Sequence, residues 1–296
     1  MSRIFVPRIF VLGNASLDTT LRVPRLPAPG ETLMATGILR SPGGKGLNQA
    51  VVAARAGAEV RFLAPLGTEP ETALIRDTLA AEGLHATWAE TGAPTDLSSL
   101  MVAPDGENCI VSTGACCDSL GHAHAEPFLA ALRPGDLLLM QGNLRLEVTL
   151  AAAQAARRLG ARVMLNTAPL RWDYAGLLPL CDLVVANRFE ARTITGEADP
   201  QAAALALGGT AIVTLGAQGC LLADPALHRF PAVEAQAIDT TGAGDVFCGT
   251  LAAAWAQGAL LPGAIAAAQR AAAISVTREG CFGSFPTKEE SKHVLF

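Results

Sequence analysis

Short apolar runs alternate with segments of helical periodicity along most of the chain. The pattern begins with a buried-strand run at residues 8–13, which ends in a glycine. Later strand patterns occupy residues 60–66, 137–140, 163–166, 183–186 and 211–215, and helix patterns occupy residues 47–56, 72–81, 148–159, 190–195 and 246–256. This alternation predicts a doubly wound α/β fold, in which helices cover both faces of a mostly parallel sheet.

Two β-rich stretches interrupt the alternation, at residues 14–42 and 92–117. Both are too long for ordinary connections between elements. The second stretch contains two strand patterns, residues 98–102 and 108–112, joined by the turn Pro104-Asp105-Gly106. We therefore expect the two stretches to pair into a small separate sheet that acts as a lid.

Length, charge and hydropathy limit the classes of function. A chain of 296 residues is near the upper limit for one hydrophobic core, so residues 1–296 are expected to form one domain. The net charge of −5 and the lack of a basic run argue against a nucleic-acid partner. The longest nearly apolar run, residues 264–274, contains Gln269 and Arg270 and is shorter than the roughly 20 residues of a membrane span. A small-molecule ligand is the default expectation, with no nucleic-acid or membrane partner.

The N-terminal residues and the cysteines indicate in which cellular compartment the protein is expected. Pro7 and Arg8 interrupt the N-terminal apolar residues before a signal-peptide core could form, so we expect no export signal. The seven cysteines form no C-x-x-C pair, which indicates reduced thiols and a cytoplasmic protein. Adjacent Cys116 and Cys117 are interpreted as small apolar residues. Residues 288–296 have a polarity compatible with a helix but no evident packing partner.

The first segment that suggests chemistry is I-D-T-T-G-A-G-D-V-F at residues 238–247. A glycine-containing turn at the start of a helix points free N–H groups, here of Gly242, Ala243 and Gly244, at one spot and predicts an anion site. Asp245 lies in the first helical turn, beside this site, where it could accept a proton during in-line phosphoryl transfer to an alcohol. Taken alone, the segment fits equally well a capped turn without chemistry.

Two other nucleotide-binding motifs do not fit the sequence. The dinucleotide pattern G-x-G-x-x-G fails because Phe247 occupies the third glycine position, which argues against an NAD-dependent oxidoreductase. The Walker loop fails because Gly46, and not Ser or Thr, follows Gly44-Lys45.

The segment S-P-G-G-K-G-L-N-Q-A at residues 41–50 places Lys45 and Asn48 one turn apart at a helix start, which is a weak signal by itself.

Taken together, the segments P-G-G-K-G-L-N-Q-A and D-T-T-G-A-G-D-V-F-C-G closely resemble the two signatures of the ribokinase-like (PfkB) carbohydrate kinases. They occur in the family's order, about 200 residues apart. Further similar segments cover nearly the whole chain, at residues 30–32, 166–169, 187–190, 214–219 and 271–286. The resemblance is strongest to the ribokinases. It implies an ATP-dependent kinase that phosphorylates a primary hydroxyl of a small sugar, and a homodimer formed through the lid.

The resemblance also implies roles for single residues. Asp245 matches the family's catalytic base. The family's anion hole, which binds the transferred phosphoryl group, is matched by Gly242, Ala243 and Gly244. The sugar-binding positions match Ser16, Asp18, Gly44, Lys45, Asn48 and Asn143, and the ATP-binding positions match Asn187, Thr214, Gly216 and Gly219.

Two kinds of cation site follow from the same resemblance. Asn187 and Glu190 match the N-x-x-E element that organises Mg²⁺ through water. A monovalent-cation site, expected to hold K⁺ beside the anion hole, matches Asp239, Thr241, Ser275, Arg278, Gly280 and Ser284.

The acceptor pocket departs from the ribokinase pattern at two positions. Ser16 replaces an asparagine, and Asn143 replaces a glutamate. Because both positions belong to the acceptor pocket, the sequence predicts a shift of preference away from ribose, while the ATP side supports kinase activity.

Other acceptors are therefore considered, namely a ketohexose, a phosphosugar or a nucleoside. A phosphosugar would need basic pocket residues, for which Arg145 is the one candidate, although a solvated arginine at a helix start is preferred there. A nucleoside would need aromatic surfaces from the lid, and residues 14–42 contain no aromatic residue. A catalytically silent sensor would be expected to lose Asp245 or the glycines beside it.

Overall fold

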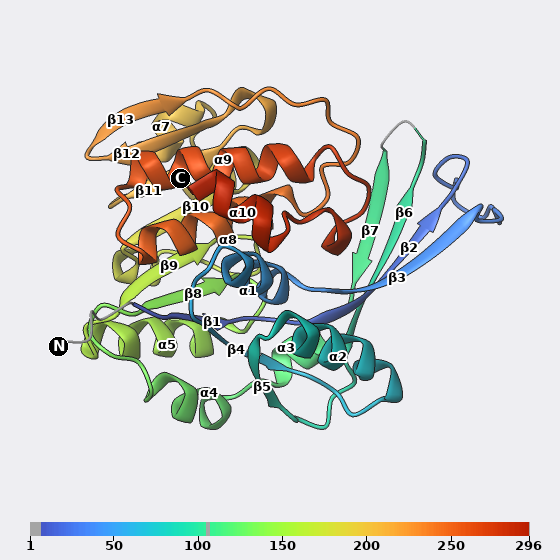
Figure 1. Ribbon diagram of the computed structural model, residues 1–296, viewed down its shortest axis with the longest axis horizontal. Coiled ribbons are helices and arrows are strands. Elements are labelled where there is room, and N and C mark those ends of the chain that lie inside the picture. The colour runs from blue at the N-terminus through green and yellow to red at the C-terminus, as the bar shows by residue number, and fades with distance from the viewer. Residues whose placement is uncertain (1–6, 105–106, 296) are drawn as a thin grey trace.

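A computed structural model describes residues 7–104 and 107–295. Within these residues the larger sheet has nine strands in the order β13-β12-β11-β10-β9-β8-β1-β4-β5 (Figure 1). In that order the strands span Ala226–Phe230, Cys220–Asp224, Ala211–Thr214, Leu183–Asn187, Arg162–Asn166, Leu137–Gln141, Ile9–Leu12, Val60–Pro65 and His85–Ala89. Neighbouring strands from β11 to β5 pair in parallel, and β12 and β13 add an antiparallel edge. The predicted doubly wound, mostly parallel sheet is confirmed.

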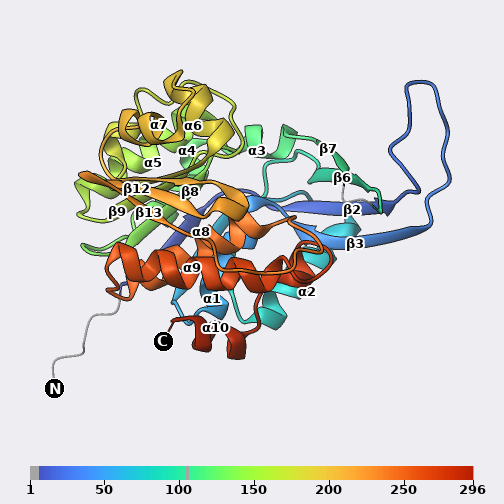
Figure 2. The ribbon, with the colours of Figure 1, turned by 90° about the horizontal axis from the view of Figure 1, so that it is seen from above.

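Helices cover both faces of this sheet (Figure 2). One face carries α1 (Lys45–Arg55), α2 (Ala73–Glu82), α8 (Ala243–Ala256), α9 (Leu261–Ser275) and α10 (Lys288–Leu295). The other carries α3 (Ala115–Ser119), α4 (His122–Leu129), α5 (Leu146–Arg158), α6 (Arg188–Thr195) and α7 (Pro200–Ala206). Strand β1 shows why two layers form: Ile9 and Val11 pack into the core under α1 and α8, whereas Phe10 and Leu12 pack into the core under α4 and α5.

The two β-rich stretches form a separate four-stranded sheet that projects from the body of the protein (Figure 1). Its order is β3 (Gly37–Gly43), β2 (Ser16–Arg22), β6 (Asp96–Val102) and β7 (Asn108–Ser112). Strands β2 and β6 pair in parallel, and the outer two pairs are antiparallel. The predicted lid sheet is therefore present. Asp105 and Gly106 of the expected turn lie outside the described residues.

Several elements differ from the sequence expectation. Strand β5, helix α4 and the β12–β13 hairpin are not predicted from the apolar pattern. Most residues of β5 and all residues of β13 are exposed or half-buried, and α4 is short and contains Pro127, whereas β12 is buried but has a run of only four apolar residues. The C-terminal segment has a packing partner after all, since Val294 of α10 is buried and its carbonyl accepts a hydrogen bond from Arg270 of α9. Four short 3₁₀ turns complete the secondary structure, at Pro70–Thr72, Leu178–Leu180, Gly216–Gln218 and Phe282–Ser284.

Close packing between α1 and α8 sets up the site. A Cβ added at Gly249 of α8 would lie 2.7 Å from the Gln49 carbonyl oxygen and 2.8 Å from Cβ of Val52, both in α1. The absence of a side chain at Gly249 therefore lets the two helices approach, which brings the start of α1 beside the start of α8. Among the described helices, none has the length and apolar character needed to cross a membrane.

Candidate active site

The turn before α8 forms as the sequence predicts. Gly242 is the N-cap residue in the left-handed conformation, with φ of 80°, which favours glycine. The Ala243 N–H donates to the Thr240 carbonyl at 3.2 Å, so this predicted anion-hole donor already has a local partner. Within the part of the chain that the structure describes, the N–H groups of Gly242 and Gly244 donate no hydrogen bond to the backbone, and they remain available to an anion.

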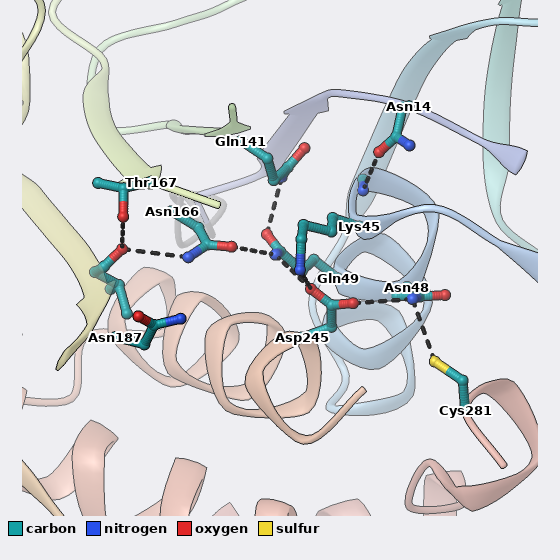
Figure 3. A network of polar contacts seen from close by, with 12 residues as sticks. Asn14, Lys45, Asn48, Gln49, Gln141, Asn166, Thr167, Asn187, Asp245 and Cys281 are labelled. Atoms are coloured by element: carbon teal, nitrogen blue, oxygen red, sulfur yellow. Dashed lines mark hydrogen bonds and ion pairs between the residues drawn. The ribbon is translucent and has the colours of Figure 1, made fainter. Parts of the chain in front are cut away.

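Asp245 follows this turn and is only 5% exposed. Its two carboxylate oxygens each accept one amide hydrogen bond, from Asn48 Nδ2 to Oδ2 and from Gln49 Nε2 to Oδ1, both at 2.9 Å (Figure 3). The Lys45 ammonium lies 4.0 Å from Oδ1, and the charge of Asp245 raises the pKa of Lys45. Because a carboxylate oxygen has two lone pairs, each oxygen can still accept a proton from a substrate.

A second layer of amides holds Gln49 in place. Gln141 Nε2 donates to Gln49 Oε1 at 2.9 Å, and Gln49 Nε2 also donates to Asn166 Oδ1 at 3.1 Å (Figure 3). Gln141 and Asn166 are the last residues of β8 and β9, and they are neighbours in the sheet register. The carboxyl edge of the sheet therefore fixes the orientation of the Asp245 carboxylate.

The start of α1 is held by the turn after β1. Asn14 Oδ1 accepts the Gly46 N–H at 3.1 Å, and the Asn14 carbonyl accepts the Leu47 N–H at 3.0 Å. Gly44 has φ of 96°, and a Cβ there would lie 2.9 Å from the Cα of Ala15. The glycine is thus required by both conformation and space, and it places Lys45 and Asn48 next to Asp245.

A cavity of about 910 Å³ opens in front of Asp245, between the lid and the body. Six of the predicted residues on the acceptor side line it, together with Gly242 and Thr241, and they are Ser16, Asp18, Gly44, Lys45, Asn48 and Asn143. Ser16 donates to Asp18 Oδ1 at 2.8 Å. Burial raises the pKa of Asp18 above its ordinary 3.8. The structure therefore brings the residues predicted to bind the acceptor and Asp245, the predicted base, into one cavity.

Two lining residues carry acceptor atoms that lack a partner. Asn48 Oδ1 and Asn143 Oδ1 are buried and accept no hydrogen bond within the described residues. Buried polar atoms are normally satisfied, so these two oxygens are suited to the hydroxyl protons of a ligand. Arg145 does not line the cavity, since it is exposed and pairs with Glu147 at 3.3 Å.

The predicted ATP residues lie on the neighbouring strands and do not line this cavity. Asn187 ends β10 and pairs in register with Thr214, the last residue of β11. Gly216 and Gly219 follow in the next turn, both with positive φ. These four residues share the carboxyl edge of the sheet with Gln141 and Asn166, which is where ligands bind in open α/β sheets.

Glu190 is 6% exposed and forms a capping box with Asn187. Its Oε2 accepts from Thr167 Oγ1 and from the Asn187 N–H, both at 2.9 Å, and its Oε1 accepts from Asn187 Nδ2 at 2.7 Å. Within the residues described, no three His, Cys, Asp or Glu side chains gather as metal ligands. The Asn187 and Glu190 oxygens thus suit a hydrated Mg²⁺ better than a fully protein-bound one.

The predicted monovalent-cation residues surround the turn before α8. Asp239 Oδ1 accepts the Thr241 N–H at 2.8 Å, and Oδ2 accepts the Gly280 N–H at 2.9 Å. Ser275 and Ser284 are buried, and their hydroxyls donate to nearby backbone carbonyls. Arg278 forms an ion pair with Glu290. The set offers carboxylate, hydroxyl and carbonyl oxygens, which are donors that suit a hard cation.

Sequence reasoning missed several residues of the site. Gln49 could have been found, because Lys45, Asn48 and Gln49 are spaced i, i+3 and i+4 and share one face of a helix. Cys281 gave no such signal, although its Sγ lies 3.5 Å from Asn48 Nδ2 (Figure 3). Burial raises the pKa of the Cys281 thiol, which keeps it neutral. Other cavity residues that were missed include Asp96, Ser98, Ser112, Asp118 and Arg171.

Comparison with known proteins decides the family, since the pattern of the pfkB family carbohydrate kinases matches residues 6–288. The chain belongs to this family. It is 36% identical to a ribokinase of Haemophilus influenzae over 297 aligned positions, which cover 96% of this chain and 97% of that protein. The family's members are carbohydrate kinases, so the prediction of an ATP-dependent sugar kinase is confirmed.

Solved structures agree with this assignment. A ribokinase of Thermotoga maritima has a TM-score of 0.87 at 30% identity and covers 98% of this chain and 99% of its own. A ribokinase of Arabidopsis thaliana, complexed with ribose and ATP, has a TM-score of 0.86 at 26% identity with the same coverage. The ribokinase-like fold is therefore confirmed, including the small second sheet.

Proposed function

We propose that this kinase transfers the γ-phosphoryl group of ATP to a primary hydroxyl of a sugar of about the size of ribose, with Asp245 as the base. The observation that carries the proposal is the position of Asp245, which lies in the wall of the acceptor cavity and one residue from the free Gly244 N–H. The relatives named as ribokinases support ribose as the first acceptor to test.

The chain's own residues account for the steps of transfer. The acceptor hydroxyl gives its proton to an Asp245 oxygen while its own oxygen bonds to the γ-phosphorus and the bond from that phosphorus to ADP breaks. The N–H groups of Gly242 and Gly244, with the positive end of α8 behind them, face the charge that develops on the phosphoryl oxygens. Lys45 adds a positive charge beside the same carboxylate.

Two cations complete the proposal. Bound Mg²⁺ would neutralise phosphate charge, held near Asn187 and Glu190, and bound K⁺ would add positive charge beside the anion hole, held by oxygens around Asp239. We also propose the cytoplasm as the compartment, supported by seven free cysteines and the use of ATP.

The lining of the cavity favours a neutral sugar over the other acceptors. Four carboxylates line it, from Asp18, Asp96, Asp118 and Asp245, against two cations, from Lys45 and Arg171. Arg171 already donates to both oxygens of Asp118, at 2.8 and 2.9 Å. A phosphosugar would therefore meet net negative charge. No aromatic side chain of the described residues lines the cavity, so a nucleoside base would find no stacking surface.

Replacement of the base tests the proposal. In Asp245→Asn, we expect kcat to fall by about 10² to 10⁴, because the amide cannot accept the hydroxyl proton. Affinity for ADP, measured by calorimetry, should stay close to that of the wild type, since the nucleotide residues lie on other strands. A variant that keeps more than about a third of the wild-type kcat would show that Asp245 is not the base.

A further inference from the structure

The lid carries a row of polar residues across three of its strands. Asp18 of β2 is directly opposite Ser98 of β6, and Ser98 is directly opposite Ser112 of β7. Residues opposite one another in a sheet project from the same face. All three line the acceptor cavity, and the strands that carry them lie side by side in Figure 1. Ser99, the next residue of β6, projects from the other face and does not line the cavity.

The direction of the hydrogen bonds along this row follows from chemistry. Ser98 Oγ and Ser112 Oγ are 2.9 Å apart, and the Ser98 hydroxyl, opposite Asp18 in the register, is one of the groups that lower the pKa of Asp18. An ionised carboxylate only accepts, so the Ser98 proton points to Asp18. The Ser112 proton must then point to Ser98. The Ser112 oxygen is the last in this row of hydrogen bonds, so its lone pairs remain available to a ligand in the cavity.

We propose that Ser98 and Ser112 form a subsite that accepts a hydrogen bond from one further hydroxyl of the sugar and so sets acceptor specificity. The inference rests on the proposed sugar-kinase function and extends it to residues that act at the lid. A hydroxyl of the bound sugar donates to the Ser112 oxygen, and the charge of Asp18 strengthens this bond through Ser98 because linked hydrogen bonds polarise one another. A sugar that lacks this hydroxyl cannot make this bond, and the exposed Ser112 oxygen then keeps only water as a donor.

The test removes a serine hydroxyl from the protein and a hydroxyl from the sugar, first separately and then together, and compares the losses of activity. Wild type, Ser112→Ala, Ser98→Ala and the control Ser99→Ala are assayed for kcat/KM with ribose and with its 1-deoxy, 2-deoxy and 3-deoxy analogues. In the wild type, we expect one analogue to be poorer than ribose by about 3- to 10-fold, the range for the loss of one hydrogen bond to a hydroxyl pair that is not fully buried. In Ser112→Ala, ribose should fall by a similar factor while that analogue is nearly unchanged, so the discrimination is lost.

Further readouts separate recognition from lid stability. KM for ATP should stay constant in all variants, and Ser99→Ala should match the wild type throughout. In Ser98→Ala, Asp18 loses a donor to its charged form, so the decline of kcat/KM at acid pH should move to higher pH. An equal loss for ribose and all three analogues in Ser112→Ala, or no loss at all, would overturn the subsite. If the wild type phosphorylates no sugar, the proposed function fails, and the subsite fails with it.

Discussion

The two carboxylates closest to the expected acceptor, Asp18 and Asp245, have different hydrogen-bond donors. Asp245 accepts from the side-chain amides of Asn48 and Gln49, which are fixed by the sheet edge behind them. Asp18 accepts from the Ser16 hydroxyl and lies opposite Ser98, whose hydroxyl also lowers its pKa. Burial raises the pKa of Asp18, the two hydroxyls lower it, and the charge of Asp245 raises it, with an upward shift as the result. The surroundings of Asp18 therefore favour its protonation.

This difference predicts a pH dependence of acceptor use. As the pH falls through the raised pKa of Asp18, protonation removes a hydrogen-bond acceptor for the sugar, so kcat/KM for the sugar should decline with an apparent pKa above 3.8. A raised pKa in the folded state means that the folded chain binds this proton more tightly than the unfolded chain, so protonation of Asp18 itself favours folding as the pH falls. Activity should thus decline while circular dichroism at the same pH still reports a folded protein.

Asp18→Asn is the matching variant, because an amide of similar shape does not titrate. At neutral pH its kcat/KM for the sugar should be lower by about 10- to 100-fold, since a donor replaces one acceptor atom. Its acid decline should begin at a lower pH than in the wild type. The same acid decline in both proteins would contradict the assignment to Asp18.

The sequence predicted many of the residues that line the cavity, such as Lys45 and Asp245 within the two signatures and Asp18 outside them. It did not predict partners that are brought together only by the fold. Gln141 donates to Gln49, which is 92 positions away in the sequence and in turn holds Asp245. Cys281 contacts Asn48, which is 233 positions away. Neither residue belongs to a local pattern, because their contacts depend on the order of strands in the sheet.

At the scale of elements, the start of α8 depends on a segment far along the chain. Asp239 joins the turn before α8 to the loop after α9, because its two oxygens accept N–H groups from Thr241 and Gly280. Each oxygen keeps a second lone pair that could bind a cation. A positive charge held there would order the turn that presents the Gly242 and Gly244 N–H groups.

We expect K⁺ to activate the enzyme for this reason. At equal ionic strength, kcat in K⁺ should be about tenfold higher than in tetramethylammonium, an effect that needs only about 1.4 kcal/mol of transition-state stabilisation. Asp239→Asn should have a lower rate and should lose the response to K⁺. Asp199→Asn is the control, since Asp199 also accepts a backbone N–H, at the start of α7, and should keep the response. Equal rates of the wild type in both cations would contradict the predicted cation site.

Element prediction succeeded where residues are buried on both sides and failed at the edges of the sheet. Strand β8 was predicted over residues 137–140, because these four residues are buried and form an unbroken apolar run that ends at Gln141. Strand β13 was not, because it lies at the sheet edge and most of its residues are exposed or half-buried. An edge strand is stabilised mainly by its pairing with a neighbour, which leaves little apolar pattern in its own sequence.

At the scale of the whole molecule, the lid exposes apolar side chains that a monomer leaves in water. Ile38 is 63% exposed and Val111 is 66% exposed, and Leu97 between their strands is also exposed. By register these three residues project from the face of the lid opposite Asp18 and Ser98. A thin sheet projecting from the body cannot bury this face by itself (Figure 2). A second copy of the chain is the occupant that the family resemblance implies.

We therefore predict a homodimer that forms through the lid. The wild type should sediment at twice the mass of the chain in analytical ultracentrifugation. Val111→Lys should raise the dimer dissociation constant by about 10- to 1,000-fold, because a lysine charge would replace an apolar contact in the interface. Leu260→Lys is the matched control: Leu260 is 82% exposed and precedes α9 at the end of the molecule away from the lid (Figure 1), so this variant should stay dimeric. A monomeric wild type, or equal dissociation constants for the two lysine variants, would exclude this lid face as the interface.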